Sequence, residues 1–283
     1  MGEEGMIPQM DRPGLEALAR NMRRRVLETI HRAGAGHIGG SLSEMEILVE
    51  LYFSFLRLDP RNPGWEDRDR FILSKGHASA GYYAVLSERG FFPLEVLRSY
   101  EREGGSLQAH PDMRKCPGVD YSTGSLGQGL SIGIGIALGG MLRGQNYRTV
   151  VLLGDGECQE GQVWEAAMFA GTRRVRRLIA IVDSNGVQLS TTVREGMSLE
   201  PFDRKWAAFN WRVMTVDGHN LAALHETLRE AGRVGEEGPV AILARTVKGK
   251  GVSFMENRYE WHGRAPNDAE LARALKDLEG GGE

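Results

Sequence analysis

One stretch of the chain, residues 150–187, restricts the possible folds more than any other part of the sequence. It starts with an apolar run at residues 150–153 and ends with another at 178–182; both are short and rich in β-branched residues, as buried strands are. Between them, residues 162–171 place valine and alanine side chains at helical spacing. The stretch therefore predicts a strand, a helix and a second strand, and a right-handed connection would make the strands parallel.

A polar turn follows each of these two predicted strands. Gly154, Asp155 and Gly156 come after the first strand, and Asn185 lies in the turn after the second. Because parallel strands end at the same edge of a sheet, we expect the two turns to be neighbours. Carboxylate and amide oxygens bind Mg²⁺, glycines let backbone N–H groups approach an anion, and phosphate oxygens would complete the metal's shell. The two turns predict a site for a magnesium-bound diphosphate.

The residues of this stretch resemble the thiamin diphosphate signature of the transketolase family. The segments GDGECQEG, WEAA and IAIVDSNGVQ are similar to the form that this signature takes in transketolases. The resemblance implies that Asp155, the Asn185 side chain and the Val187 carbonyl bind Mg²⁺. It also implies that Gly156, Glu157 and Asn185 contact thiamin diphosphate.

The same resemblance, with the apolar pattern, predicts an α/β fold with a doubly wound, mostly parallel sheet and helices on both faces. Residues 15–265 would form the thiamin diphosphate-binding domain, between an N-terminal tail at 1–14 and a C-terminal helix and tail at 266–283. Ser41 is expected to cap a helix. Further strands are expected at 71–73, 211–216 and 240–244, and helices at 15–31, 41–55, 94–101, 202–209, 221–231 and 269–278.

Two further segments, SKGHAS and TGSLGQG, are similar to transketolase motifs. His77 follows a short predicted strand and begins a helix, where an imidazole donor beside the positive helix terminus suits a phosphate oxygen. The resemblance implies that His77 binds the cofactor diphosphate. It also implies that the backbone of Gly124, Ser125 and Leu126 borders the thiamin.

Three other histidines lie in loops that contain glycine or proline, where a packing role explains them poorly. His37 lies in AGHIGGSLS, His110 in QAHPD, and His262 in WHG after the sequence KGKG, whose lysines and glycines are expected to form a mobile loop. The resemblance implies that His37 and His110 contact substrate and that His262 reaches the diphosphate and the reacting carbon. The family usually has proline where Ile38 stands. A zinc site is the competing use of clustered histidines, but none of the seven has a zinc-ligand spacing.

The composition argues against several functions. The net charge of −3 over 283 residues disfavours nucleic-acid binding. No apolar run nears the roughly 20 residues of a membrane span, and the acidic, polar start is unlike a secretory signal, so we expect a cytoplasmic protein. Cys116 and Cys158 are expected to be free thiols. The arginine-rich run at 173–177 is expected to be a solvated surface at a helix end, with nucleic-acid or phosphate binding, or subunit contact, as alternatives.

The resemblance implies a transferase that moves a two-carbon ketol unit from a ketose phosphate to an aldose phosphate. In that family a pyrimidine-binding domain, which carries a catalytic glutamate, follows the domain seen here. We therefore expect the amino-terminal subunit of a split transketolase, in a heterotetramer with a second polypeptide and with Glu160 at the interface. The alternatives are a 2-oxo acid dehydrogenase α component, a related carbon–carbon bond-forming synthase and a non-catalytic partner. A dinucleotide site is disfavoured, because Ile132 stands where its fingerprint needs glycine.

Overall fold

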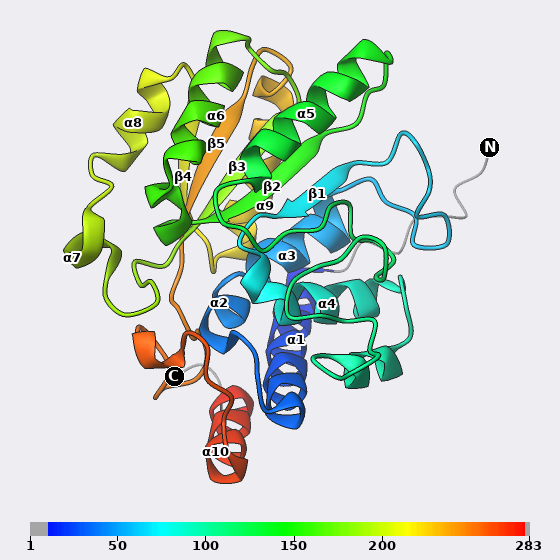
Figure 1. The fold of residues 1–283 in the computed structure, drawn as a ribbon, viewed down its shortest axis with the longest axis vertical. Coiled ribbons are helices and arrows are strands. Elements are labelled where there is room, and N and C mark those ends of the chain that lie inside the picture. The colour runs from blue at the N-terminus through cyan, green and yellow to red at the C-terminus, as the bar shows by residue number, and fades with distance from the viewer. Residues whose placement is uncertain (1–10, 281–283) are drawn as a thin grey trace.

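Five parallel strands form one sheet within residues 11–280, the part of the chain that the computed structural model describes. Their order in the sheet is β1-β2-β3-β5-β4 (Figure 1). Each strand predicted from the sequence is confirmed, with ends that differ by at most two residues. The strands are β1 (Arg70–Leu73), β2 (Thr149–Gly154), β3 (Leu178–Ser184), β4 (Arg212–Asp217) and β5 (Val240–Arg245).

The register of the sheet places the ends of three strands side by side. Gly154 of β2 pairs with Asp183 of β3, and Asp183 pairs in turn with Ala244 of β5. The turns after β2, β3 and β5 therefore leave the sheet at one edge, as the parallel strand-helix-strand unit predicted. The candidate metal ligands lie in the first two of these turns.

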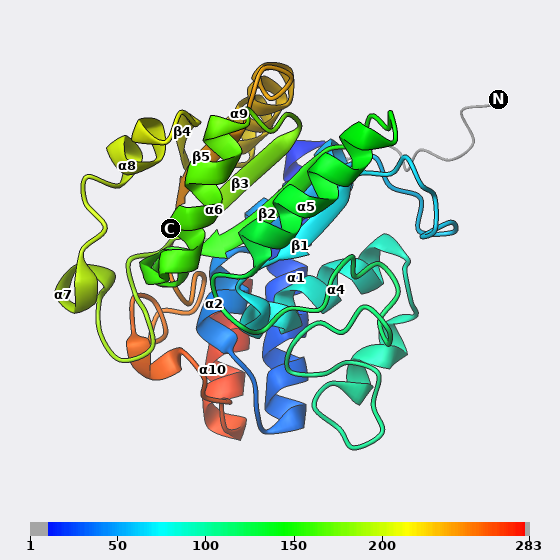
Figure 2. The ribbon, with the colours of Figure 1, turned by 45° about the horizontal axis from the view of Figure 1, so that its top comes forward.

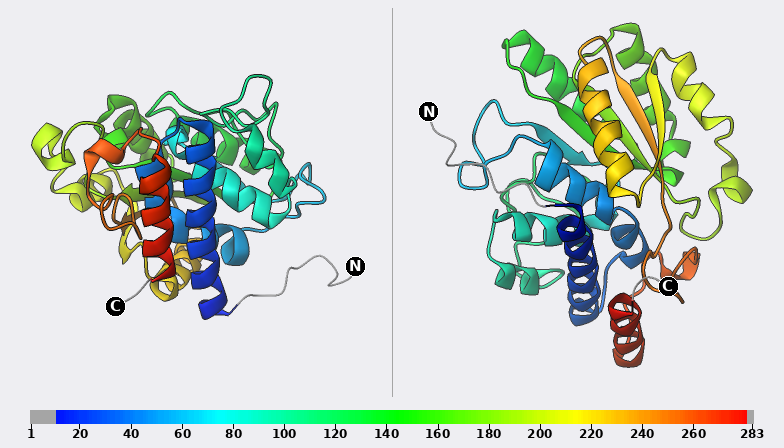
Figure 3. Two further views of the ribbon diagram at one scale, coloured as in Figure 1. Left: turned by 90° about the horizontal axis from the view of Figure 1, so that it is seen from below. Right: turned by 180° about the vertical axis from the view of Figure 1, so that it is seen from behind.

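Helices cover both faces of the sheet, which confirms the predicted doubly wound α/β fold. Strand side chains alternate between two cores: Val150 and Leu152 pack on one face, Val151 and Leu153 on the other. One face is covered by α5 (Gly129–Leu142), α6 (Gly161–Thr172) and α8 (Phe202–Ala208) (Figure 2), and the other by α1 (Arg12–Ala33), α3 (Met45–Glu50) and α9 (Leu221–Val234) (Figure 3).

The ends of the long terminal helices follow from capping residues. The side chain of Asp11 accepts a hydrogen bond from Gly14 N–H at 2.9 Å, so α1 begins at Arg12, three residues before its expected start. Asn267 forms a capping box with Glu270 at the start of α10 (Asp268–Glu279), where the sequence predicted a helix. α10 lies beside α1 (Figure 3). The other α-helices are α2 (Ile38–Ser43), α4 (Ser79–Arg89) and α7 (Val193–Met197).

The helix expected at residues 41–55 is wrong in its start and in its continuity. Ser41 lies inside α2, where its hydroxyl donates to the carbonyl of His37 at 2.8 Å instead of capping a helix. A break at Glu44 separates α2 from α3, and a π-helical turn, Leu51–Phe55, follows. Residues 94–101 also differ from expectation, because they form a 3₁₀ helix, Leu94–Ser99.

Parts of the expected tails, residues 1–10 and 281–283, lie outside the described residues. Across residues 11–280, none of the helices combines the length and the apolar character that a bilayer crossing requires.

Candidate active site

Asp155 lies directly after β2 and is 5% exposed. Its two carboxylate oxygens accept hydrogen bonds from the backbone N–H groups of Gly156, at 2.8 Å, and Gly186, at 2.6 Å. Burial raises the pKa of Asp155 to about 6, although these N–H groups act in the opposite direction. A cation beside the carboxylate would offset the cost of burying its charge, so Asp155 fits the role of a metal ligand.

Asn185 and Val187 lie in the neighbouring turn, after β3. The side-chain oxygen of Asn185 accepts from Val187 N–H at 3.1 Å, and its nitrogen donates to the carboxylate of Asp183, also at 3.1 Å. The carbonyl of Val187 accepts from Nζ of Lys248 at 3.0 Å. The three predicted metal ligands thus come from two adjacent turns, and one of them already binds a cationic group.

Four histidines from four separate segments meet at this edge of the sheet. The ring centroids of His37 and His77 are 5.1 Å apart, and His262 lies 5.1 Å from His77 and 5.4 Å from His37. The ring of His110 is 6.3 Å from that of His37. All four were singled out from the sequence, and the fold brings them together.

The environment keeps three of these imidazoles neutral. Burial, assisted by the charge of Lys75, holds the pKa of His77 well below its usual value. Burial and then His110 lower the pKa of His37, while burial and Lys248 lower the pKa of His262 to about 3. A neutral imidazole can both donate and accept a hydrogen bond, which suits contacts with hydroxyl groups.

The loop before α5 lies against the histidines. Gly124 has φ of +145°, and a Cβ there would lie 3.0 Å from the ring of His110, so a larger residue would be strained and crowded. Ser125 and Leu126 are exposed beside it. The carboxylate of Glu157 accepts from the N–H of Gly127 at 2.9 Å, and also from Gly154 N–H and the Ser74 hydroxyl. Glu157 therefore fixes this loop, and its carboxylate is engaged by protein groups.

Gly156 and Glu160 lie on the segment between β2 and α6. A Cβ at Gly156 would come within 3.1 Å of the side chain of Gln188, so the turn leaves little space beside the backbone. Glu160 directly precedes α6 and is exposed, and its carboxylate accepts no hydrogen bond from the residues that the structure describes. It is free to meet a group from outside this chain.

Two lysines of the site were missed in the sequence, although both stand in motifs that were noted there. Lys75 of SKGHAS is buried; it forms an ion pair with Asp183, and its Nζ lies 3.2 Å from the carboxyl group of Glu44. Lys248 of KGKG was expected in a mobile loop, but it is 2% exposed, with its Nζ 2.8 Å from Nδ1 of His262. Burial, followed by the charge of Lys75, lowers the pKa of Lys248 to about 8. The available signal was that each lysine stands beside a glycine in a motif that was noted for its chemistry.

Several buried polar atoms at the site have no hydrogen-bond partner within residues 11–280. They include Nδ1 of His37, Oγ1 of Thr123 and Oε1 of Gln188. Buried polar atoms are almost always paired in folded proteins. Unpaired atoms grouped around one sheet edge therefore fit a polar ligand at this position.

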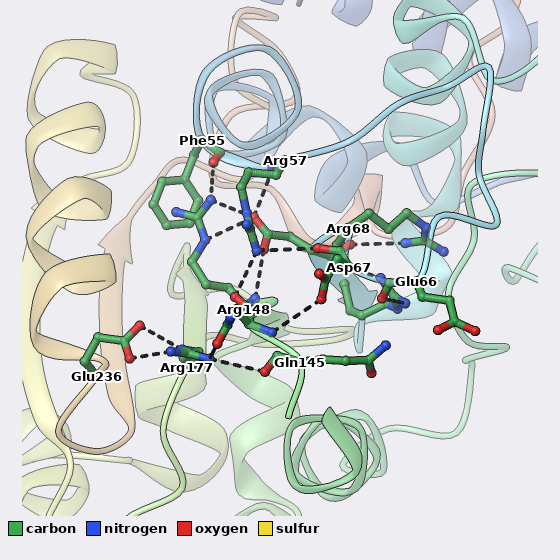
Figure 4. Close-up of polar contacts among 12 residues, drawn as sticks. Phe55, Arg57, Glu66, Asp67, Arg68, Gln145, Arg148, Arg177 and Glu236 are labelled. Carbon is green, nitrogen blue, oxygen red and sulfur yellow. Dashed lines mark hydrogen bonds and ion pairs between the residues drawn. The ribbon is translucent and has the colours of Figure 1, made fainter. Parts of the chain in front are cut away.

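The arginine-rich run directly precedes β3 and so lies at the end of the strands opposite to the site. Arg177 forms an ion pair with Glu236 at 2.8 Å and donates to the carbonyl of Gln145 (Figure 4). The preceding arginines, residues 173, 174 and 176, are exposed, as predicted for a solvated surface.

Among the described residues, no group of three or more His, Cys, Asp and Glu side chains is arranged to hold a metal ion. Cys116 and Cys158 are buried free thiols.

Histidines away from the site have structural partners. Nδ1 of His219 lies 2.8 Å from Glu46, and its Nε2 accepts from Val247 N–H, so it connects three segments instead of serving only its turn. Nδ1 of His225 lies 2.7 Å from Glu50.

Comparisons with known proteins agree with this geometry. Residues 15–280 match the family model described as transketolase, thiamine diphosphate binding domain. The chain is 43% identical to the 6-deoxy-6-sulfo-D-fructose transketolase subunit of a Clostridium species, over 94% of this chain and 96% of that protein. It is 38% identical to an apulose-4-phosphate transketolase subunit of Phocaeicola vulgatus, over 93% of each.

Full-length transketolases are similar over part of their length. The chain is 38% identical to the transketolase of Rattus norvegicus, over 90% of this chain and 41% of that one. A transketolase structure from Campylobacter jejuni has a TM-score of 0.89 and 27% identity, over 95% of this chain and 43% of that one. From the site, the family match and these relatives, it follows that this chain belongs to the transketolase family and corresponds to the thiamine diphosphate-binding domain of that family.

Proposed function

We propose that this chain is the thiamin diphosphate-binding subunit of a two-component, Mg²⁺-dependent transketolase. The enzyme would transfer a two-carbon ketol unit from a ketose or ketose phosphate to an aldose or aldose phosphate. The observation that carries this proposal is the meeting of four histidines with Asp155, Asn185 and Val187 at one edge of the sheet.

The residues present suit a metal-bound diphosphate. Asp155, the Asn185 side-chain oxygen and the Val187 carbonyl form an oxygen donor set of the kind Mg²⁺ prefers. Gly156 and His77 would contact the diphosphate, and Lys248, whose Nζ lies against both Val187 and His262, would add positive charge. The backbone of Gly124, Ser125 and Leu126 would border the thiamin.

Bound thiamin diphosphate supplies the nucleophilic carbon and holds the negative charge that develops when a ketose is cleaved. The chain itself binds and orients the substrate. His37, His110 and His262 would hydrogen-bond the sugar hydroxyls and move protons at their oxygens. The lowered pKa of His37 and His262 keeps these two imidazoles neutral, which suits the hydrogen-bonding part of this role. Glu160, exposed at the start of α6, would meet the catalytic glutamate of a partner.

A partner polypeptide that carries the pyrimidine-binding domain would complete the site, in a heterotetramer with two copies of each chain. The names of the two most similar relatives reported above both describe a subunit of a transketolase, which supports a second component. Exposed apolar side chains on α5, on α6 and in the loop before α5 offer a surface for it: Leu126, Leu142, Met168 and Phe169. Two free cysteines suit the cytoplasm.

The experiment compares wild type with Asp155→Ala, each mixed with the partner candidate, thiamin diphosphate and Mg²⁺. We expect the wild-type mixture to transfer ketol units and the chain alone to show at most about a thousandth of that rate, because the general base step needs the partner's glutamate. Asp155→Ala should abolish both metal-dependent cofactor uptake in calorimetry and turnover. Asp203→Ala, an exposed aspartate on α8, is the control and should leave both unchanged.

The outcomes separate the alternatives. Full activity of the chain alone would contradict the split enzyme. Turnover of 2-oxo acids but not ketoses would favour the dehydrogenase α component or the carbon–carbon bond-forming synthase. An assembled complex in which Asp155→Ala is as active as wild type would indicate a non-catalytic subunit.

A further inference from the structure

The carboxylate of Asp183 is the centre of a buried hydrogen-bond network directly beneath the candidate metal ligands. Asp183 is fully buried near the end of β3. One of its oxygens, Oδ2, accepts from the Ser43 hydroxyl at 2.6 Å and from Nζ of Lys75, and the other accepts from the Thr246 hydroxyl. These donors come from α2, from the turn after β1 and from the residue after β5, so one side chain joins the segments next to His37, His77 and His262.

The same carboxylate also fixes the orientation of the Asn185 amide. Nδ2 of Asn185 donates to Oδ2 of Asp183 at 3.1 Å, and Oδ1 of Asn185 lies on the other side, next to Val187 N–H. An ionised carboxylate only accepts hydrogen bonds. If the amide turned over, its oxygen would face that carboxylate and its N–H₂ would face the backbone donor. Both contacts would be repulsive, so the amide has one favourable orientation.

Lys75 and Glu44 complete the network. Nζ of Lys75 contacts Asp183, the carbonyl of Gly40 at 3.1 Å and Glu44 at 3.2 Å. A buried carboxylate needs a charge partner and several hydrogen bonds to stay ionised, and Asp183 has both. The lysine thus maintains the acceptor that the asparagine requires.

We propose that Asp183 is a positioning residue: with Lys75 as its counter-ion, it holds the Asn185 side-chain oxygen in the orientation that binds the metal. This inference rests on the proposed function, since it takes Asn185 as a ligand of Mg²⁺. Asp183 would orient this ligand in advance without itself touching the metal. Partners of this kind commonly change metal affinity by 10- to 100-fold.

The test is metal affinity, measured apart from turnover. Mn²⁺ binding to the full chain, assembled with its partner and saturated with thiamin diphosphate, can be followed by electron paramagnetic resonance. Asp183→Asn replaces the ionised acceptor of Asn185 Nδ2 either with a neutral amide oxygen, which accepts more weakly, or with an N–H₂ group, which repels it. We expect the Kd for Mn²⁺ to rise about 10- to 100-fold. Ser43→Ala removes one other hydrogen bond from the same carboxylate and leaves Asn185 paired, so its Kd should change by less than about threefold.

A second variant keeps the proposal testable if Asp183→Asn does not fold. Asp183→Asn alone leaves Lys75 with a weaker partner, whereas Asp183→Asn combined with Lys75→Met removes both charges and keeps a similar volume. The double variant should have the wild-type circular dichroism spectrum and still bind Mn²⁺ at least tenfold more weakly. In the wild-type chain the side-chain N–H₂ protons of Asn185 should exchange slowly with water in NMR spectra.

Each outcome is decisive. Wild-type affinity in a folded Asp183→Asn chain or double variant would overturn the positioning role while leaving the proposed function intact. Rapid exchange of the Asn185 N–H₂ protons would overturn it even if both variants failed to fold. Failure of the wild-type complex itself to bind Mn²⁺ would instead overturn the proposed function.

Discussion

Glu44 is a glutamic acid that holds its proton in the folded chain at a pH where an unfolded chain has lost it. It is fully buried, and within residues 11–280 the one charged group it contacts is Lys75, which also contacts Asp183. Burial raises the pKa of Glu44 from 4.5 to about 8, and the charge of Lys75 offsets this effect only in part. With Glu44 protonated, the buried group contains one carboxylate and one ammonium, whose charges balance.

This buried acid should make the chain less stable as the pH rises. Between pH 4.5 and about 8 the unfolded chain has released the Glu44 proton and the folded chain still holds it, so unfolding releases a proton and the free energy of unfolding falls with pH. The slope should be about 1.4 kcal/mol per pH unit from this one group. Glu44→Gln should flatten the urea midpoint against pH over this window. Parallel profiles for the two proteins would contradict the assignment.

At the scale of one element, α5 contains glycines with opposite surroundings. A Cβ at Gly133 would lie 2.5 Å from Cγ2 of Val151, because this face of the helix rests directly on the sheet. Gly135, two residues later, is exposed, and a Cβ there would have nothing within 4 Å. Glycine is therefore needed at the first position for close packing and has no packing role within the chain at the second.

This contrast gives a matched pair of substitutions on one helix. Gly135→Ala should stabilise the isolated chain by about 0.5–1 kcal/mol, since alanine loses less backbone entropy in a helix than glycine does. Gly133→Ala should destabilise it by about 1–3 kcal/mol, because the methyl group would overlap Val151. Urea unfolding of both variants measures the difference. Equal effects would show that α5 does not rest on β2 as described.

At the scale of the whole molecule, α5 and α6 cover the face of the sheet away from α1 and α9 (Figure 2), and several of their apolar side chains are exposed. Leu142 is 89% exposed and Met168 is 52% exposed. Leu126 lies in the loop beside the site, and Glu160 directly precedes α6. Exposed apolar residues on two neighbouring helices favour an interaction surface on this face.

Met168→Glu should therefore weaken assembly with the proposed partner without unfolding this chain. We expect at least a tenfold weaker complex in sedimentation or calorimetry, because a charge would be buried in the apolar centre of an interface. The stability of the isolated chain should change by less than about 0.5 kcal/mol. Leu94→Glu is the control, since Leu94 is 46% exposed on the short 3₁₀ helix near α1. Equal binding by both variants would move the interface elsewhere.

Much of the fold was predictable because its signals are local. Strands buried on both faces require continuous apolar runs, as at residues 150–153, and caps such as Asn267 act within one turn of helix. The interruption of residues 41–55 was missed. Ser41 donates its hydroxyl to the carbonyls of His37 and Ala78, and the second partner is distant in the sequence. The candidate site was predictable where the motif specifies chemistry, as at Asp155 and His77.

The sequence by itself determined which residue types stand at the ends of the strands and hence the chemistry available at the sheet edge. Only the tertiary structure decided the charge state and the orientation of those residues. The pairing of Lys75 with Asp183 and Glu44, the burial of Lys248 against His262, and the engagement of Glu157 by the loop before α5 all join segments far apart in the chain. Charge state and orientation depend on burial and on such distant partners, and these exist only once the chain has folded.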